Sequence, residues 1–226
     1  MDFNERTKLL IDDTRLHRSC VAVFGLGGVG SYTAEALVRA GIGKLIICDN
    51  DCITESNINR QLLATHSTVG RTKAGVAIER YLDINPALEI HAFDEFILPD
   101  NIDYFFEKLL VKPDYVADCI DTVSGKLAII SKCKSLGIPV ISSMGTGNKL
   151  HPELFKIADI SKTSVCPLCR VMRRELRERN ITDVPVLFSE EEPIKTGDTT
   201  IGSISTVPSV AGLLIADHII KDLVTM

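Results

Sequence analysis

The sequence predicts an α/β fold with a doubly wound, mainly parallel sheet. Short apolar runs alternate with longer segments that have helical spacing, and the runs are apolar at consecutive positions, which indicates strands covered on both faces. The first run breaks into four glycines in VAVFGLGGVGS, residues 21–31. A glycine-rich turn between a strand and a helix brings bare backbone close to phosphate, which is typical of the Rossmann-like class.

The elements follow in a regular order up to about residue 143. The predicted strands are 20–24, 44–48, 88–93, 115–120 and 138–142, and the predicted helices are 31–40, 73–84, 102–110 and 125–136. Right-handed crossovers between them give the doubly wound sheet. We expect one domain over 1–226, made of an N-terminal helical arm (1–19), a nucleotide-binding core (20–150) and a C-terminal extension (151–226).

The C-terminal extension is expected to hold antiparallel strands plus helices. Its predicted parts are a strand at 154–160, a charged helix at 166–179, a polar loop at 188–203 and a closing helix at 206–223. Ser205 or Thr206 suits the N-cap of the closing helix, and Pro208 suits its first turn.

Composition is that of an ordinary soluble globular protein, with 45% hydrophobic and 24% charged residues. The sequence contains no apolar stretch of about 18 residues and no signal-peptide pattern, so we expect a cytoplasmic protein without a membrane span. Its seven cysteines do not form the framework of a small secreted fold. The net charge of −5 argues against a wholly basic nucleic-acid binder but allows a local basic patch.

The glycines match the G-x-G-x-x-G pattern of nucleotide-binding folds. Gly25 permits the tight turn, Gly27 and Gly28 let backbone N–H groups face phosphate, and Gly30 lets helix and strand pack closely. The following helix adds a partial positive charge at its N-terminus. Asp49, at the end of the second strand, is placed to hold ribose hydroxyls. Up to this point NAD and ATP fit equally well.

Cations further along the chain favour ATP. A triphosphate with Mg²⁺ carries more charge than a dinucleotide pyrophosphate and needs cations beyond the glycine loop. Arg60 and Lys73 can supply them, with Asn57 and Gln61 as neutral hydrogen-bonding neighbours. Each cation taken singly could be an ordinary surface charge.

These motifs together resemble the ThiF/MoeB/ubiquitin-activating-enzyme superfamily, whose members use ATP to adenylate a carboxylate. The resemblance rests on GLGGVGS, DND at 49–51, NINRQ at 57–61, GRTK at 70–73 and DCID at 118–121, and it spans about residues 5–223. It implies an ATP site that includes Asp51 beside Asp49, and Asn59, Arg60 and Lys73 on the phosphates. It also implies that Asp121 is the Mg²⁺-associated catalytic acid.

Two points about this implied site stay open at this stage. Asp121 could also cap the helix that follows it, and Asp118, within the strand, is the weaker candidate for the catalytic acid. Arg6 resembles a superfamily arginine that reaches the ATP of the opposite subunit, which implies a homodimer.

The ATP site does not show which molecule carries the carboxylate that is adenylated, so this acceptor must be inferred from other features of the chain. MoeB-like enzymes adenylate a ubiquitin-fold carrier and usually bind zinc through two C-x-x-C pairs, whereas this chain has one pair, Cys166 and Cys169. Because a closed zinc site takes four ligands, we favour two incidental cysteines at a helix start, with a zinc site completed by a second copy as the alternative. The predicted loop at 188–203 contains no cysteine that could form a thioester.

Other segments resemble the branch of tRNA threonylcarbamoyladenosine dehydratases. They are RTKLL near the start, ADISKTSVCPL at 158–168, the Arg-rich helix after it, and GSISTVPSVAG at 202–212. This branch activates the carboxylate of threonylcarbamoyladenosine at tRNA position 37 and needs no cysteine nucleophile. A cysteine desulfurase or another protein of a sulfur-carrier system is a further partner that the resemblance implies.

The Arg-rich helix also supports tRNA binding through its charge. Arg170, Arg173, Arg174 and Arg177 are spaced to share one face, to which an anionic backbone would be attracted. A solvated helix face or a dimer interface explains the same pattern equally well.

Three other functions are kept as alternatives to the dehydratase. The first is adenylation of a ubiquitin-fold sulfur carrier, and the second is a non-catalytic nucleotide-binding partner or sensor. An NAD-dependent oxidoreductase is the third and most distant.

Overall fold

The computed structural model describes residues 3–197 and 199–225. Across these residues runs one seven-stranded sheet with the order β3-β2-β1-β4-β5-β7-β6, parallel throughout except for the pair β7 and β6. The strands are β1 (Cys20–Phe24), β2 (Lys44–Cys48), β3 (Glu89–Phe93), β4 (Tyr115–Asp118), β5 (Val140–Ser143), β6 (Phe155–Asp159) and β7 (Pro185–Ser189). This sheet confirms the predicted Rossmann-like fold with an antiparallel pair in its C-terminal part.

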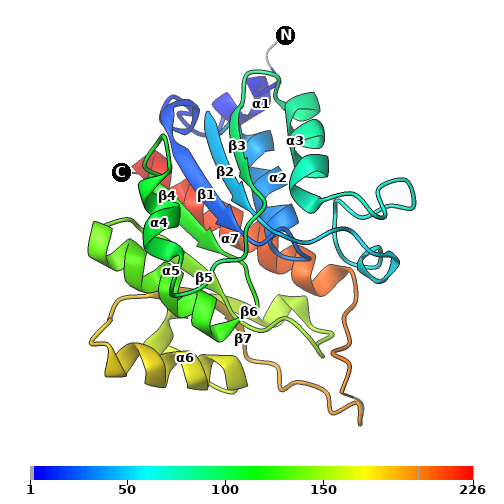
Figure 1. Cartoon of the computed structure of the whole chain (residues 1–226), viewed down its shortest axis with the longest axis vertical. Coiled ribbons are helices and arrows are strands. Elements are labelled where there is room, and N and C mark those ends of the chain that lie inside the picture. The colour runs from blue at the N-terminus through cyan, green and yellow to red at the C-terminus, as the bar shows by residue number, and fades with distance from the viewer. Residues whose placement is uncertain (1–2, 198, 226) are drawn as a thin grey trace.

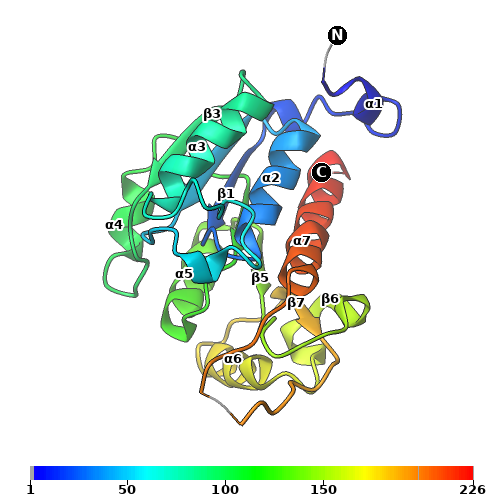
Figure 2. The ribbon, with the colours of Figure 1, turned by 90° about the vertical axis from the view of Figure 1, so that its right-hand side faces the viewer.

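Helices cover both faces of the sheet (Figures 1 and 2). One face carries α2 (Gly30–Ala40), α3 (Lys73–Ile84) and α7 (Thr206–Thr225), and the other carries α4 (Ile102–Glu107), α5 (Val123–Leu136) and α6 (Pro167–Glu178). α1 (Glu5–Lys8) is one turn long, and short 3₁₀ helices occur at Leu16–Arg18, Glu55–Asn57, Pro152–Leu154 and Ile160–Lys162. Within the described ranges, no helix is both long and apolar enough to cross a membrane.

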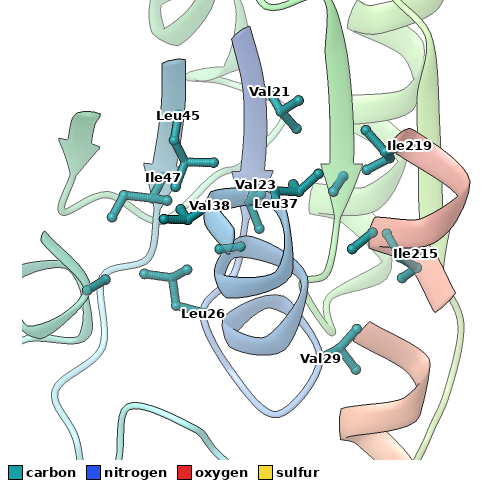
Figure 3. Close-up of a cluster of buried hydrophobic side chains, with 14 of the residues drawn as sticks. Val21, Val23, Leu26, Val29, Leu37, Val38, Leu45, Ile47, Ile215 and Ile219 are labelled. Atoms are coloured by element: carbon teal, nitrogen blue, oxygen red, sulfur yellow. The ribbon is translucent and has the colours of Figure 1, made fainter. Parts of the chain in front are cut away.

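The strand β1 shows why the runs are apolar at every position. Val21 and Val23 point into a core shared with α2 and α7 (Figure 3). Cys20, Ala22 and Phe24 alternate with them and pack into a second core with α4, α5 and α6. Because successive side chains leave a strand on opposite sides, a strand buried on both faces must be apolar throughout.

The strand order determines where a ligand can bind. The chain builds outward from β1 through β2 to β3 and then crosses back to β4 on the other side of β1. The loops after β1 and β4 therefore diverge and leave a crevice at the carboxyl edge of the sheet, the usual ligand site of such folds.

Two segments differ from the prediction. Residues 185–189 form β7, which pairs with β5 in parallel and with β6 in antiparallel, so the loop predicted from residue 188 starts only after Ser189. The predicted N-terminal helical arm is mostly turns, with α1 and one 3₁₀ helix as its only helical segments among residues 3–19.

Candidate active site

A cavity of 780 Å³ opens at the carboxyl edge of the sheet. It is lined by residues at and just beyond the ends of five parallel strands: Gly25, Gly27 and Gly28 after β1, 48–51 from the last residue of β2, 95–97 after β3, 119–122 after β4 and 143–147 from the last residue of β5. Residues that are far apart in sequence meet here because parallel strands all end at the same edge.

The glycine loop needs glycine for two separate steric reasons. Gly25 has φ +85°, and a Cβ there would lie 2.9 Å from the carbonyl oxygen of Cys119. Gly30 does not line the cavity; a Cβ on it would lie 1.7 Å from the oxygen of Gly25, so it permits α2 to begin directly against the turn. Gly27 and Gly28 lie on the cavity wall, as the sequence predicts.

A buried charge cluster forms the next part of the wall. Asp49 is 8% exposed, and its carboxylate accepts the N–H of Leu26 at 2.6 Å and of Asp51 at 2.9 Å. Lys73 is 4% exposed, and its Nζ lies 2.7 Å from Asp51 Oδ2 and 3.4 Å from Asp49 Oδ2. The cation that begins α3 is therefore held at the cavity by the two carboxylates that follow β2, and Asp49 also fixes the glycine loop.

The segment after the short helix at Glu55–Asn57 supplies a second cation. Arg60 lines the cavity, and its guanidinium donates only to neutral oxygens, the Ser56 carbonyl and Asn59 Oδ1, both at 2.9 Å. No carboxylate pairs with it in the described part of the chain, so its charge is available to a ligand. Asn57 also lines the cavity, whereas Asn59, predicted to bind the phosphates, does not line it and donates to the carbonyl of the lining residue Ser203 at 3.0 Å.

Two polar atoms at the cavity lack a protein partner. Gln61 is 8% exposed, and its Oε1 is buried without a hydrogen bond among the described residues; the same holds for the hydroxyl of Thr122. Both residues line the cavity. Because a buried polar atom without a partner is costly, these atoms suit a polar ligand in the cavity.

The two acids of the DCID segment, Asp118 and Asp121, lie in different environments. Asp118 is fully buried and bonds to Lys126 and Ser142, and its Oδ1 accepts the N–H of Ile120 at 3.3 Å. Asp121 is exposed and lines the cavity. The N-cap position of α5 belongs to Thr122, so the alternative of Asp121 as the helix cap is wrong.

Five helices place their N-terminal residues at the cavity. Val29 before α2, Lys73 at the start of α3, Thr122 before α5, Leu168 in the first turn of α6 and Pro208 in the first turn of α7 all line it. Each N-terminus carries a partial positive charge, so their convergence favours an anionic ligand. From the sequence, a helix N-terminus at the nucleotide was predicted only for the helix that follows the glycine loop.

Several lining residues were not predicted at all. The loop after β5, residues 143–147, and the segment 95–97 after β3 line the cavity, as do Leu168, Ile201 and Ser203. The run SMGTG at 143–147, directly after the predicted strand 138–142, was the signal available for the first loop, because ligands in open α/β sheets bind outside the carboxyl ends of the strands.

Arg6, like Gly30 and Asn59, is a predicted site residue that does not line the cavity, and its helix α1 places it farther from the cavity than they are. It is exposed on α1, and the neighbouring Asn4 donates to the carbonyl of Ala40 at the end of α2, which places α1 by the opposite edge of the sheet. Within one chain Arg6 therefore does not reach the cavity.

The four arginines predicted to share a face of α6 divide into two kinds. Arg173 is half-buried and donates to the carbonyl oxygen and hydroxyl of Thr163, at 2.8 and 2.7 Å, so it braces the preceding loop. Arg174 pairs with Glu175 at 2.8 Å. Arg170 and Arg177 are exposed, and no ion pair engages either of them in the part of the chain that the structure describes.

Comparison with known proteins identifies the family. A sequence model of the ThiF family matches residues 8–226. The chain belongs to the ThiF family. This agrees with the resemblance drawn from the glycine loop and the charged motifs that follow it.

Among the relatives compared below, those named as dehydratases cover the most of this chain. This ThiF-family protein is 41% identical to the tRNA threonylcarbamoyladenosine dehydratase of Bacillus subtilis, with 92% of this chain and 88% of that protein covered. The crystal structure of the Escherichia coli tRNA N6-threonylcarbamoyladenosine dehydratase in complex with ATP superposes with a TM-score of 0.90 at 31% identity, covering 99% of this chain and 93% of that one. The sulfur carrier protein ThiS adenylyltransferase of E. coli is 30% identical over 63% of this chain and 59% of its own length.

Proposed function

We propose that this ThiF-family protein is an ATP-dependent tRNA threonylcarbamoyladenosine dehydratase. Its threonyl carboxylate substrate, at tRNA position 37, attacks the α-phosphorus of ATP and releases pyrophosphate. The carbamoyl group then closes on the acyl-adenylate to give the cyclic form, with release of AMP. The observation that carries the proposal is that the glycine loop, Arg60, Lys73 and Asp121 line one cavity in a chain 41% identical to a dehydratase.

The proposed roles follow from charge and position. Arg60 and Lys73 neutralise the phosphates, while the backbone at Gly27 and Gly28 and five helix N-termini surround them. Asp49 receives the ribose hydroxyls. Since little covalent chemistry falls to the protein, the rate gain comes from positioning and electrostatic stabilisation.

Asp121 is the proposed Mg²⁺-associated residue. Magnesium in nucleotide enzymes is held by one or two carboxylates together with phosphate oxygens and waters, and an exposed carboxylate at a phosphate-binding cavity fits that set. When bound, the ion would neutralise charge on the triphosphate as the carboxylate approaches.

A homodimer of single adenylating domains is part of the proposal. Arg6 lies outside the cavity of its own chain, so a catalytic role for it requires a second copy. Leu9 and Leu10, just after α1, are 81% and 86% exposed, and apolar side chains so exposed on one arm suit a contact between subunits. Arg170 and Arg177 are the proposed tRNA contacts on α6.

The substitution Asp121→Ala tests the catalytic assignment. We expect adenylate formation to be abolished while the thermal unfolding midpoint stays unchanged, because the side chain is exposed and takes no part in the buried network around Asp118. Asp103→Ala is the matched control, since Asp103 is an exposed acid whose side chain is 75% accessible on α4. Full activity in the Asp121 variant would overturn the assignment.

Adenylation of a ubiquitin-fold sulfur carrier is the second candidate, favoured by the similarity to the ThiS adenylyltransferase. The two functions share the ATP site and differ in the acceptor. ATP–pyrophosphate exchange that depends on a carrier protein and not on tRNA would favour the carrier. ATP binding without turnover on either acceptor would favour a non-catalytic partner.

A further inference from the structure

Asn59 belongs to the NINRQ motif but does not line the cavity, unlike its neighbours Asn57, Arg60 and Gln61. Both ends of its side-chain amide are nevertheless engaged. Its Oδ1 accepts a hydrogen bond from Arg60 Nη1 at 2.9 Å, and its Nδ2 donates to the carbonyl of Ser203 at 3.0 Å. Asn59 therefore joins a cation of the cavity to a part of the cavity wall that lies far along the chain.

The contacts of Arg60 leave one edge of its guanidinium to a ligand. Nη1 has two hydrogens, and it donates to the Ser56 carbonyl and to Asn59 Oδ1, both at 2.9 Å. Among the residues that the structure describes, nothing accepts from Nε or Nη2. These two nitrogens form the planar fork that binds a phosphate through two parallel hydrogen bonds. Asn59 thus holds the guanidinium in one orientation before a ligand arrives, which lowers the entropy cost of binding.

The other partner of Asn59 belongs to the wall segment, residues 201–203. Ile201 and Ser203 line the cavity, and Ile201 is 72% exposed, so it lies at the rim. Asn148, in the loop after β5, holds the segment through Gly202. Its N–H donates to the Gly202 carbonyl at 2.8 Å, and its Oδ1 accepts the Gly202 N–H at 2.6 Å. Asn148 has φ +56°, a conformation that asparagine adopts more readily than most residues.

The wall segment is therefore held from two sides, by Asn148 from the loop after β5 and by Asn59 from the NINRQ motif. Of these two asparagines, Asn59 also contacts the guanidinium of Arg60. A ligand that fixes this guanidinium also fixes the Asn59 amide, and with it the carbonyl of Ser203. One side chain thus provides a continuous hydrogen-bonded connection from a phosphate-binding cation to the rim of the cavity.

We propose that Asn59 is a positioning residue, which acts on the phosphates of ATP through Arg60 without touching them and fastens the wall segment to that arginine. ATP binding then orders residues 201–203 at the rim of the cavity, where the acceptor must enter. The inference rests on the proposed ATP site but is independent of the acceptor, because tRNA and carrier protein would meet the same wall.

A double-mutant cycle on the full chain tests the action through Arg60, with ATP affinity measured by calorimetry. Asn59→Ala should bind ATP about fivefold more weakly, the factor that corresponds to one ordinary hydrogen bond. Arg60→Ala should bind it at least about tenfold more weakly, as for a lost hydrogen bond to a charged group. The double variant should bind ATP as Arg60→Ala does, because Asn59 then has no guanidinium to orient. The unfolding midpoint of Asn59→Ala should stay at the parental value, since the residue is exposed.

A fivefold effect of Asn59→Ala that persists in the Arg60→Ala background would overturn the proposal, because Asn59 would then act on ATP independently of Arg60. Parental ATP affinity in Asn59→Ala would overturn it as well. No ATP binding by the parent protein would contradict the ATP site itself and this inference with it. ATP binding without dehydration of tRNA would contradict only the dehydratase.

Amide hydrogen exchange of peptides that cover 201–203 tests the ordering of the wall segment. Saturating ATP should slow exchange there in the parent protein, and this protection should be lost in Asn59→Ala. Without ATP, Asn148→Gly should speed exchange at Gly202, because it keeps the backbone conformation and removes the Oδ1 acceptor. Asn148→Asp, the matched control, keeps that acceptor and should exchange as the parent does. Equal protection by ATP in Asn59→Ala and the parent would overturn the coupling to the wall segment.

Discussion

Lys126 is expected to be the most sensitive residue for stability outside the cavity. Its side chain is 1% exposed and that of Asp118 is fully buried. The ammonium lies 3.2 Å from Asp118 Oδ2, 3.3 Å from Ser142 Oγ and 2.7 Å from the Ser143 carbonyl, so it joins the carboxyl ends of β4 and β5. The Asp118 carboxylate in turn holds the turn that presents Asp121.

The substitution Lys126→Met keeps most of the buried volume and removes the charge. Since breaking a buried ion pair leaves an uncompensated buried charge, we expect a loss of about 3–5 kcal/mol in the free energy of unfolding. Urea unfolding followed by circular dichroism measures it. The double variant Asp118→Asn/Lys126→Met should recover a large part of the loss, because the stranded carboxylate is then gone.

Lys132→Met is the matched control on the same helix. Lys132 pairs with Asp103, whose side chain is 75% exposed, so its loss should cost at most about 1 kcal/mol. A loss below about 1 kcal/mol in Lys126→Met, equal to that of the control, would refute the view that the buried pair holds the two strand ends together.

Three further predictions concern other parts of the chain. Gly30→Ala should lower the free energy of unfolding by about 3 kcal/mol or more, because its Cβ would lie 1.7 Å from a carbonyl oxygen. Gly27→Ala is the control and should change the unfolding midpoint little, because the nearest neighbour of its Cβ would lie at 3.9 Å. Equal effects would contradict the steric argument. Arg170→Ala should weaken tRNA binding in a salt-dependent way without altering unfolding, while Arg173→Ala should cost about 1 kcal/mol of stability, and filter binding with urea titration separates the two. Burial raises the pKa of Glu35, but hydrogen bonds from two arginines outweigh it and leave the pKa below the ordinary value of 4.5. Glu35 therefore stabilises the fold above that value and stops doing so as the pH falls through its folded pKa. Glu35→Gln should be less stable than the parent at neutral pH, and the difference in their free energies of unfolding should shrink in acid. A difference that grows in acid would contradict this.

The sequence predicted the central sheet well because β1, β2, β4 and β5 are buried on both faces. Such strands are apolar at every position and end in turn residues, so they stand out without any tertiary information. The strand β7 was missed because PVLFS at 185–189 is too short to be told from a buried loop segment by its sequence. It is a strand because it pairs with β5 and β6.

The candidate site was only partly predictable for a related reason. Gly27, Arg60 and Lys73 belong to local motifs, and the structure brings them to one cavity. The loop at 143–147 and the N-terminus of α7 reach the same cavity through the fold rather than through any local pattern. On α6, helical spacing placed Arg173 with Arg170 on an exposed face, but the side chain of Arg173 turns to Thr163, a contact between segments that spacing does not encode.

The central proposal is tested most directly by supplying the protein with ATP, Mg²⁺ and tRNA that carries threonylcarbamoyladenosine. Nucleoside mass spectrometry under mild digestion then follows the modified nucleoside. We predict conversion to a product lighter by one water, dependent on ATP and absent in Asp121→Ala. Unchanged nucleoside, on tRNA shown to carry the modification and with ATP bound to the protein, would contradict the dehydratase and direct the search to a ubiquitin-fold carrier.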